Sequence, residues 1–77
     1  MREEFEKLVA VGKIGRQHVD SLVALAEAGY CFHRGWGFGR IRQVDPVFAR
    51  FVIDFKDKPG HSMDLAFAAE SLKPLSR

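Results

Sequence analysis

The sequence predicts an α+β fold in which an N-terminal helical hairpin packs on a small five-stranded antiparallel β-barrel. Up to residue 29, apolar residues recur with the 3.6-residue period of amphipathic helices; from Tyr30 onward they alternate with the period of two typical of strands. Between the two halves, Tyr30–Ile41 places three glycines at alternate positions among aromatic residues, which indicates a sharp chain reversal. We therefore divide the single domain into a helical lead-in at 1–29 and a barrel at 30–77.

Length and composition fit one small folded domain. The 77 residues are 47% hydrophobic and include seven Phe and one Trp, which favours a packed core over disorder. No apolar run approaches the ~20 residues that span a bilayer, and acidic residues crowd the start, where a signal peptide would be basic. The single cysteine, Cys31, cannot form an internal disulfide. We expect a soluble, cytoplasmic protein with no membrane partner.

Two helices are expected in the lead-in, at Arg2–Val11 and at about Arg16–Ala28, ended by Gly12 and Gly29. Their apolar faces are Phe5, Leu8 and Val9 in the first helix and Val19, Leu22, Val23 and Ala26 in the second. Packing against the sheet is the expected role of this pair. The alternative is a helix-turn-helix DNA reader, which the acidic residues of the second helix disfavour because they repel phosphates.

Five short strands should follow, joined by turns at Asp45–Ala49 and Lys56–Gly60, with one helical turn at residues 68–71. The expected strands are Tyr30–His33, Gly39–Val44, Arg50–Phe55, Ser62–Phe67 and Leu72–Leu75. Strands this short close as a small, bent barrel. Its inward residues should be Phe32, Ile41, Phe51, Ile53, Phe55, Met63, Leu65 and Leu72, with Phe67 inward on the fourth strand. Each buried large side chain should contribute about 1.5–3 kcal/mol.

Candidate catalytic and metal-binding groups are sparse. Cys31, His33 and His61 lack the paired spacings of a zinc site. Asp54 and Asp64 should lie on neighbouring strands but point out of the core toward basic neighbours. Cys31 shares a strand face with His33, which is only a weak motif for an activated thiol, and the glycines lack dinucleotide-binding spacing. We therefore expect no enzyme activity, no metal, no cofactor and no small-molecule substrate.

Aromatic and basic residues near the glycine turn are the candidates for partner binding. Trp36 and Phe38 alternate with the glycines, Arg40 and Arg42 share a face of the next strand, and Arg50 opens the strand after it. Such side chains suit a protein interface or a phosphate backbone. Core packing of the aromatics and a solvated basic face are the alternatives. Residues 30–77 carry eight basic and five acidic groups, a net of +3, which permits nucleic-acid binding.

His33–Ile41, with the sequence His-Arg-Gly-Trp-Gly-Phe-Gly-Arg-Ile, resembles the pattern H-x-x-W/F-G-x-G-x-V/I of Tudor-like, SH3-like barrels in bacterial transcription and repair proteins. Such barrels occur at the C-terminus of UvrD/PcrA-type helicases and in the RNA-polymerase-interacting domain of CarD and transcription-repair coupling factors. Val52–Leu65 and Phe67–Leu72 are similar to a module of long Gre-like elongation factors. The resemblance covers roughly residues 30 to 75.

The resemblance implies a non-catalytic module of a bacterial transcription elongation or repair-coupling factor. It would dock on RNA polymerase, through the β subunit, by barrel strands and loops. His33, Trp36 and the glycines match the structural turn, and Arg40 and Arg42 lie on the strand that follows it. Neither a helicase motor nor the coiled coil by which Gre factors promote transcript cleavage is recognisable, so neither activity is expected. Direct binding of DNA or RNA by the basic sheet face is the alternative.

Overall fold

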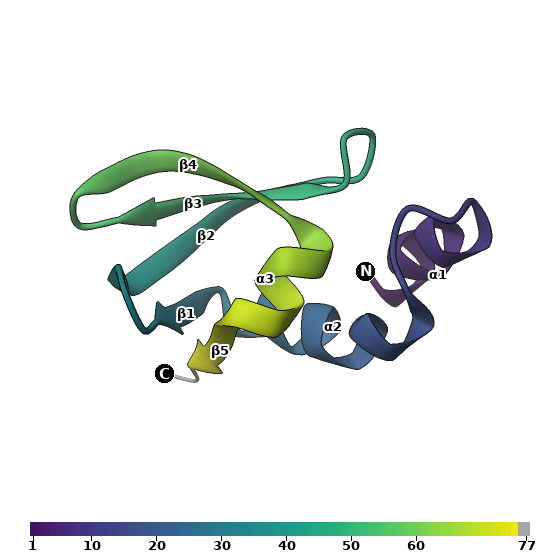
Figure 1. Ribbon diagram of the computed structural model, residues 1–77, viewed down its shortest axis with the longest axis horizontal. Coiled ribbons are helices and arrows are strands. Elements are labelled where there is room, and N and C mark those ends of the chain that lie inside the picture. The colour runs from purple at the N-terminus through teal and green to yellow at the C-terminus, as the bar shows by residue number, and fades with distance from the viewer. Residues whose placement is uncertain (76–77) are drawn as a thin grey trace.

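The computed structural model describes residues 1–75, which form a helical part and one antiparallel sheet (Figure 1). The elements are α1 (Arg2–Ala10), the 3₁₀ turn η1 (Arg16–His18), α2 (Val19–Ala28), β1 (Tyr30–His33), β2 (Gly37–Asp45), β3 (Arg50–Phe55), β4 (Lys58–Asp64), α3 (Leu65–Ser71) and β5 (Leu72–Leu75). The predicted α+β class is confirmed. The last two residues of the predicted barrel segment 30–77 lie outside the described residues.

The sheet is open, so the prediction of a closed barrel is not supported. Its strand order is β4-β3-β2-β1-β5, and β4 and β5 are its two edges among the described residues. The seven residues of α3 connect these edges and contact β3, β4 and β5 (Figure 1). A helix of that length spans about 10 Å. It buries Leu65 and Ala68 between the edges, so a helix and not a strand pair fills the gap.

One continuous core joins the inner sheet face to the helices. Phe51 and Ile53 of β3 are fully buried, as are Phe5 of α1 and Leu22 and Leu25 of α2, and all belong to the same cluster. At about 1.5–3 kcal/mol for each large side chain, their burial is the main stabilising contribution. The helical lead-in and the strands therefore stabilise one another.

The two predicted N-terminal helices are present and packed together. Phe5 anchors α1, and an exposed ion pair of 2.8 Å between Arg16 and Glu6 links it to η1. Exposed pairs of this kind contribute less than about 1 kcal/mol, so the apolar contact dominates. Gly29, with φ of 77°, ends α2 as predicted. The second helix begins with the 3₁₀ turn, so the structure shows two packed helices without establishing a simple hairpin.

The β1–β2 turn depends on His33 and on two of its glycines. His33 Nδ1 accepts the backbone N–H groups of residues 35–36 at 3.0 and 3.1 Å. Gly37 has φ of 80°, a conformation that favours glycine. A Cβ at Gly39 would lie 2.7 Å from Cε1 of Phe55, so the ring occupies the space of the missing side chain. The hydrogen bonds to His33, the positive φ of Gly37 and the close approach of Phe55 to Gly39 thus give the glycine turn its predicted structural role.

The fourth strand ends earlier than the predicted Ser62–Phe67. The chain becomes helical after Asp64, whose Oδ2 accepts the backbone N–H of Phe67 at 3.2 Å and caps α3. Phe67 is 49% exposed, so its predicted inward position is wrong. Residues 58–60 of the predicted turn lie in β4, which leaves a connection of only residues 56–57 between β3 and β4.

Phe32 also faces the opposite way from the prediction. The register places Phe32 beside Phe38 on β2 and Lys73 on β5, whereas Cys31, opposite Gly39, takes the inner position and is fully buried. The other predicted core residues lie in the buried core or pack against it. The outer face of β1 therefore carries the aromatic side chains of Tyr30 and Phe32, whereas Cys31 on the inner face is small and buried.

Candidate binding surfaces

The outer face of β5, β1 and β2 carries a group of aromatic side chains. Residues directly opposite one another in antiparallel strands project from the same face, and the register pairs Phe32 with Phe38 and Tyr30 with Arg40. The rings of Phe32 and Phe38 meet edge to face, with centroids 5.2 Å apart. Phe38 is 71% exposed. We call Tyr30, Phe32, Phe38, Arg40 and Lys73 the aromatic face.

This face lies in the most basic part of the chain. β1, β2, β5 and the β1–β2 turn contain Arg34, Arg40, Arg42 and Lys73 against one acidic residue, Asp45, a net of +3. The whole chain has a net charge of only +2, so the rest of it sums to −1. Arg34, Arg40 and Lys73 form no ion pair with any residue in the described range 1–75. The positive charge therefore gathers beside the exposed rings.

Arg42 lies at an irregularity of β2, where the pairing with β3 shifts between residues 41 and 43. Its Nε is 3.4 Å from Oδ2 of Asp54, and Oδ1 of the same carboxylate accepts the N–H of Gly60 at 2.6 Å. Asp54 also lies opposite Arg40 in the ladder. One carboxylate thus faces two arginines, and this part of the sheet keeps a positive excess.

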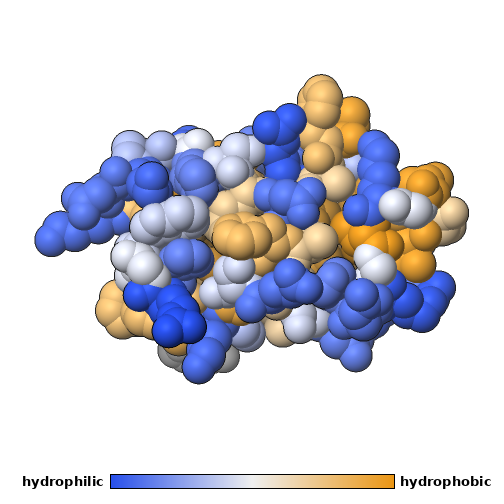
Figure 2. All heavy atoms as spheres, in the orientation of Figure 1, coloured by the Kyte–Doolittle hydropathy of each residue, from blue (hydrophilic) through white to orange (hydrophobic). Residues whose placement is uncertain are grey.

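The β2–β3 turn presents a second exposed surface, which is apolar. Val47 and Phe48 are 67% and 66% exposed. Asp45 Oδ1 accepts the N–H groups of both residues at 3.0 and 3.2 Å, Lys13 Nζ donates to the Val47 carbonyl at 2.8 Å, and the Arg50 guanidinium lies 4.8 Å from the Phe48 ring centroid. Figure 2 shows apolar side chains at this end of the hairpin. We call Val47, Phe48 and Arg50 the tip patch.

Trp36 is a packing residue of the β1–β2 turn. Its half-buried ring stacks on His33 with centroids 4.0 Å apart and an interplanar angle of 13°. The rings of Phe55 and His61 approach it edge to face at 5.5 and 4.8 Å, and Lys58 Nζ lies 5.1 Å from its centroid. Trp36 therefore fixes the turn against β3 and β4, which agrees with the packing alternative given above.

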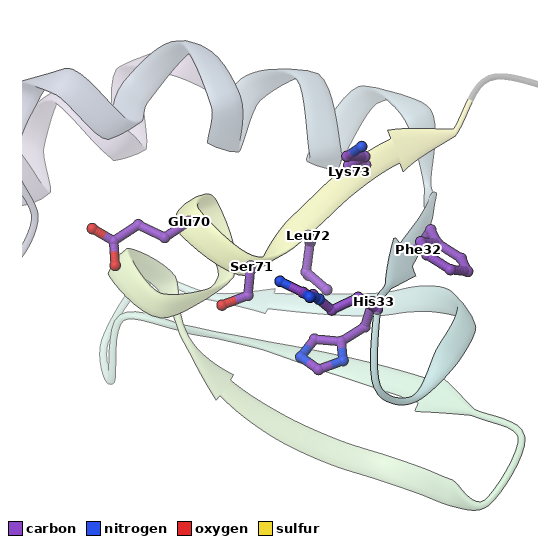
Figure 3. A pocket seen from close by; sticks show the side chains of 7 residues that line it. Phe32, His33, Glu70, Ser71, Leu72 and Lys73 are labelled. Atoms are coloured by element: carbon purple, nitrogen blue, oxygen red, sulfur yellow. The ribbon is translucent and has the colours of Figure 1, made fainter.

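An open cleft of about 640 Å³ lies between the β1–β2 turn and the α3–β5 junction (Figure 3). Leu72 points into it from β5, and the His33 ring lies on the opposite side. Phe32 and Lys73, which belong to the aromatic face, also line it, together with Arg34 of the turn. The cleft therefore adjoins the aromatic face.

The candidate catalytic groups Cys31, Asp54 and Asp64 have structural roles. Burial raises the pKa of the Cys31 thiol to about 11 against an opposing backbone hydrogen bond from Gly39, so the thiol stays protonated and weakly nucleophilic at neutral pH. Asp64 caps α3, while Asp54 lies about 13 Å farther along the β3–β4 pair, so the two carboxylates do not converge. Within residues 1–75, no group of three or more His, Cys, Asp or Glu side chains is placed to hold a metal ion.

The structure brings together three of the five residues predicted to bind a partner. Phe38 and Arg40 project from the outer face of β2. Arg42 contacts Asp54, which lies opposite Arg40 on the same face of the sheet. Trp36 is packed in the turn. Arg50 lies opposite Asp45, five residues or about 16 Å along β2 from Arg40, and belongs to the tip patch.

Sequence reasoning missed the remaining members of both surfaces. Tyr30, Phe32 and Lys73 join Phe38 only through the strand register, which no short motif encodes. Phe48 had a local signal: Asp45-Pro46 begins a side-chain-capped turn, and such turns leave the residues at their tip exposed.

The comparisons with known proteins yield no relative. No protein-family model matches the chain, and neither a curated protein nor a solved structure does. The resemblance to Tudor-like and SH3-like barrels therefore stays a prediction from the sequence. In the described part of the chain, no helix is long and apolar enough to cross a membrane.

Proposed function

We propose that the protein is a non-catalytic, cytoplasmic interaction module of a bacterial transcription elongation or repair-coupling factor, and that it docks on the β subunit of RNA polymerase through the tip patch. The sequence resemblance suggests the partner. One structural observation carries the choice of surface: Val47 and Phe48, adjacent in one turn, are 67% and 66% exposed. These two apolar side chains adjoin one another, whereas exposed apolar residues that lie singly on a surface are ordinary.

The tip patch is held in one conformation before any partner binds. Two hydrogen bonds to Asp45 set the turn, and the Lys13 bond ties it to the helical part of the molecule. A prearranged loop loses less conformational entropy on association. Phe48 with Arg50 against its ring combines the aromatic and arginine side chains that dominate binding energy at protein interfaces.

Side chains, and not an added strand, should make the contact. Each edge strand contains a Lys-Pro pair: Lys58-Pro59 in β4 and Lys73-Pro74 in β5. Proline cannot donate a backbone hydrogen bond, and edge lysines oppose pairing with a further chain. Both edges are therefore poorly suited to β-augmentation, which leaves the tip and the sheet face as binding surfaces.

We further propose that the sheet is a partly open form of the SH3-like barrel. Strands β1 to β4 form an antiparallel meander, β5 returns beside β1, and α3 lies between the two edges. These features support the resemblance that begins at the glycine turn, since the first and last strands must be neighbours in a sheet that bends back on itself.

The test is a binding titration of the labelled protein with purified bacterial RNA polymerase core free of nucleic acid. Truncation of an aromatic hot spot costs 2 kcal/mol or more, so Phe48→Ala should weaken the complex by about 30-fold or more. Phe38→Ala is the matched control, since Phe38 is 71% exposed but lies on the other surface, and it should bind like the unaltered protein. No complex with the unaltered protein, or equal loss in both variants, would overturn the proposal.

A further inference from the structure

We propose that the aromatic face binds a short segment of unpaired nucleic acid, with bases stacked on Phe38 and its neighbours and phosphates contacted by the flanking cations. This inference goes beyond docking on a protein. It does not depend on that docking, because the aromatic face and the tip patch are separate surfaces.

The first support is the exposed aromatic platform. Phe38 is 71% exposed, and the edge-to-face contact with Phe32 holds one side of its ring. Tyr30 lies two residues from Phe32 on the same face of β1. Proteins that bind single strands offer bases such rings on a sheet surface, because every base has a π-face that can stack regardless of sequence.

The second support is the position of the cations around these rings. Lys73 lies beside Phe32 on the side away from Phe38, and Arg40 follows Phe38 two residues along β2. With strands about 4.8 Å apart, Lys73, Phe32 and Phe38 form a row about 10 Å long. A single strand of nucleic acid lying over this row can stack its bases on the rings, while its phosphates contact the cations on both sides.

The cleft extends this surface. Phe32 and Lys73 line the cleft as well as the aromatic face (Figure 3). Arg34 also lines it, so the cleft has two cations against one carboxylate, that of Glu70. Arg34 and Lys73 have no ion-pair partner among residues 1–75, and Asp54, which lies opposite Arg40, forms its ion pair with Arg42. A bound phosphate therefore breaks no ion pair of these three cations. The net +3 of this part of the sheet complements an anionic strand.

Unpaired nucleic acid fits this surface better than a duplex or a protein does. In a duplex the base faces are stacked on one another, and the aromatic face offers no helix or ribbon to enter a groove. A protein partner would have to supply both carboxylates for three cations and an apolar cover for the rings. A single strand supplies both in every nucleotide through its phosphate and its base.

The test is fluorescence anisotropy with labelled ten-nucleotide oligo-dT and oligo-U, compared with a duplex of the same length at 50 mM salt. Both single strands should bind more tightly than the duplex. Phe38→Ala should weaken single-strand binding by about 5- to 150-fold, the range found for removing one stacking ring. The matched control is Phe48→Ala, of 66% exposure, which should change nothing. Unchanged circular dichroism and Trp36 fluorescence show that each variant is folded.

Salt dependence tests the charge part of the proposal separately. With about three phosphates contacted, log Kobs should fall with log salt at a slope of about −2, and Lys73→Gln should reduce that slope by about 0.7. No single-strand binding at 50 mM salt, tighter duplex binding, or equal affinity of Phe38→Ala and the unaltered protein would each overturn the inference. If the unaltered protein binds no oligonucleotide and Phe38→Ala abolishes polymerase binding, the aromatic face is a protein-binding surface instead.

Discussion

Replacing Gly39 by alanine should destabilise the fold through overpacking. The added Cβ would lie 2.7 and 2.8 Å from two ring atoms of Phe55 and 2.8 Å from Cγ2 of Ile53. Carbon atoms in favourable contact are about 3.5–4.0 Å apart, so these groups must move by most of an ångström. Phe55 and Ile53 are 3% and 0% exposed, and neither can swing into solvent. We expect a loss of about 1–3 kcal/mol.

The neighbouring glycines provide matched controls. Gly37→Ala meets no atom within 4 Å but keeps a φ of 80°, so backbone strain of about 1 kcal/mol is its main cost. Gly35→Ala has ordinary contacts, with the nearest atom of His33 at 3.4 Å, and no positive φ. It should be close to neutral. The expected order of destabilisation is therefore Gly39, then Gly37, then Gly35.

Thermal unfolding followed by circular dichroism and by Trp36 fluorescence measures these effects. For a domain of this size, 1 kcal/mol corresponds to about 4–8 °C, so Gly39→Ala should lower Tm by about 5–20 °C. An unchanged Tm for Gly39→Ala, or a greater loss in Gly35→Ala, would refute the close packing of Phe55 against β2.

Two further predictions concern the hydrogen bonds of Asp64 and Asp45, and a third concerns the burial of Cys31. Asp64→Ala removes the cap of α3 and should cost about 1 kcal/mol by chemical denaturation, whereas Asp64→Asn should retain most of it, and equal losses would contradict the capping role. Asp45→Ala releases two turn N–H groups and should weaken polymerase docking without changing oligonucleotide affinity; unchanged docking would show that the turn needs no prearrangement. Burial raises the pKa of Cys31 from 9.0 to about 11, so between those pH values only the unfolded chain loses the thiol proton. The unfolding free energy should then fall by up to about 1.4 kcal/mol per pH unit more in the unaltered protein than in Cys31→Ala, and parallel curves would refute this burial effect.

The sequence predicted the elements with strong periodicity. Phe5 and Leu8 on α1 and the alternating Phe51, Ile53 and Phe55 on β3 are buried as expected, because a 3.6- or two-residue repeat of large apolar residues leaves little choice of face. Gly29 ends α2 for an equally local reason, since its φ of 77° favours glycine.

The errors arose where a short pattern fits two structures. Met63, Leu65 and Phe67 alternate like a strand, yet Asp64 caps a helix that buries Leu65 and Ala68 three residues apart. The alanine-rich composition of residues 65–71 favoured the helix, and this signal was outweighed by the alternation.

The face of β1 was not predictable from its own residues. The aromatic Phe32 looked like a core residue, but the inner position at this point is small because Cys31 lies opposite Gly39, where the Phe55 ring fills the space. That arrangement depends on the register, which the His33 hydrogen bonds in the turn help to set. Barrel closure failed as a prediction for a similar reason, since the length of α3 decides how near β4 and β5 come.

Site-specific photocrosslinking in a reconstituted transcription complex tests the central claim most directly. A p-benzoylphenylalanine would replace Phe48 in one variant and Phe38 in another, two positions of similar exposure at 66% and 71%. With core polymerase and a labelled transcript present, position 48 should give an adduct with the polymerase β subunit, and position 38 an adduct with nucleic acid. No polymerase adduct from position 48 would contradict docking through the tip patch.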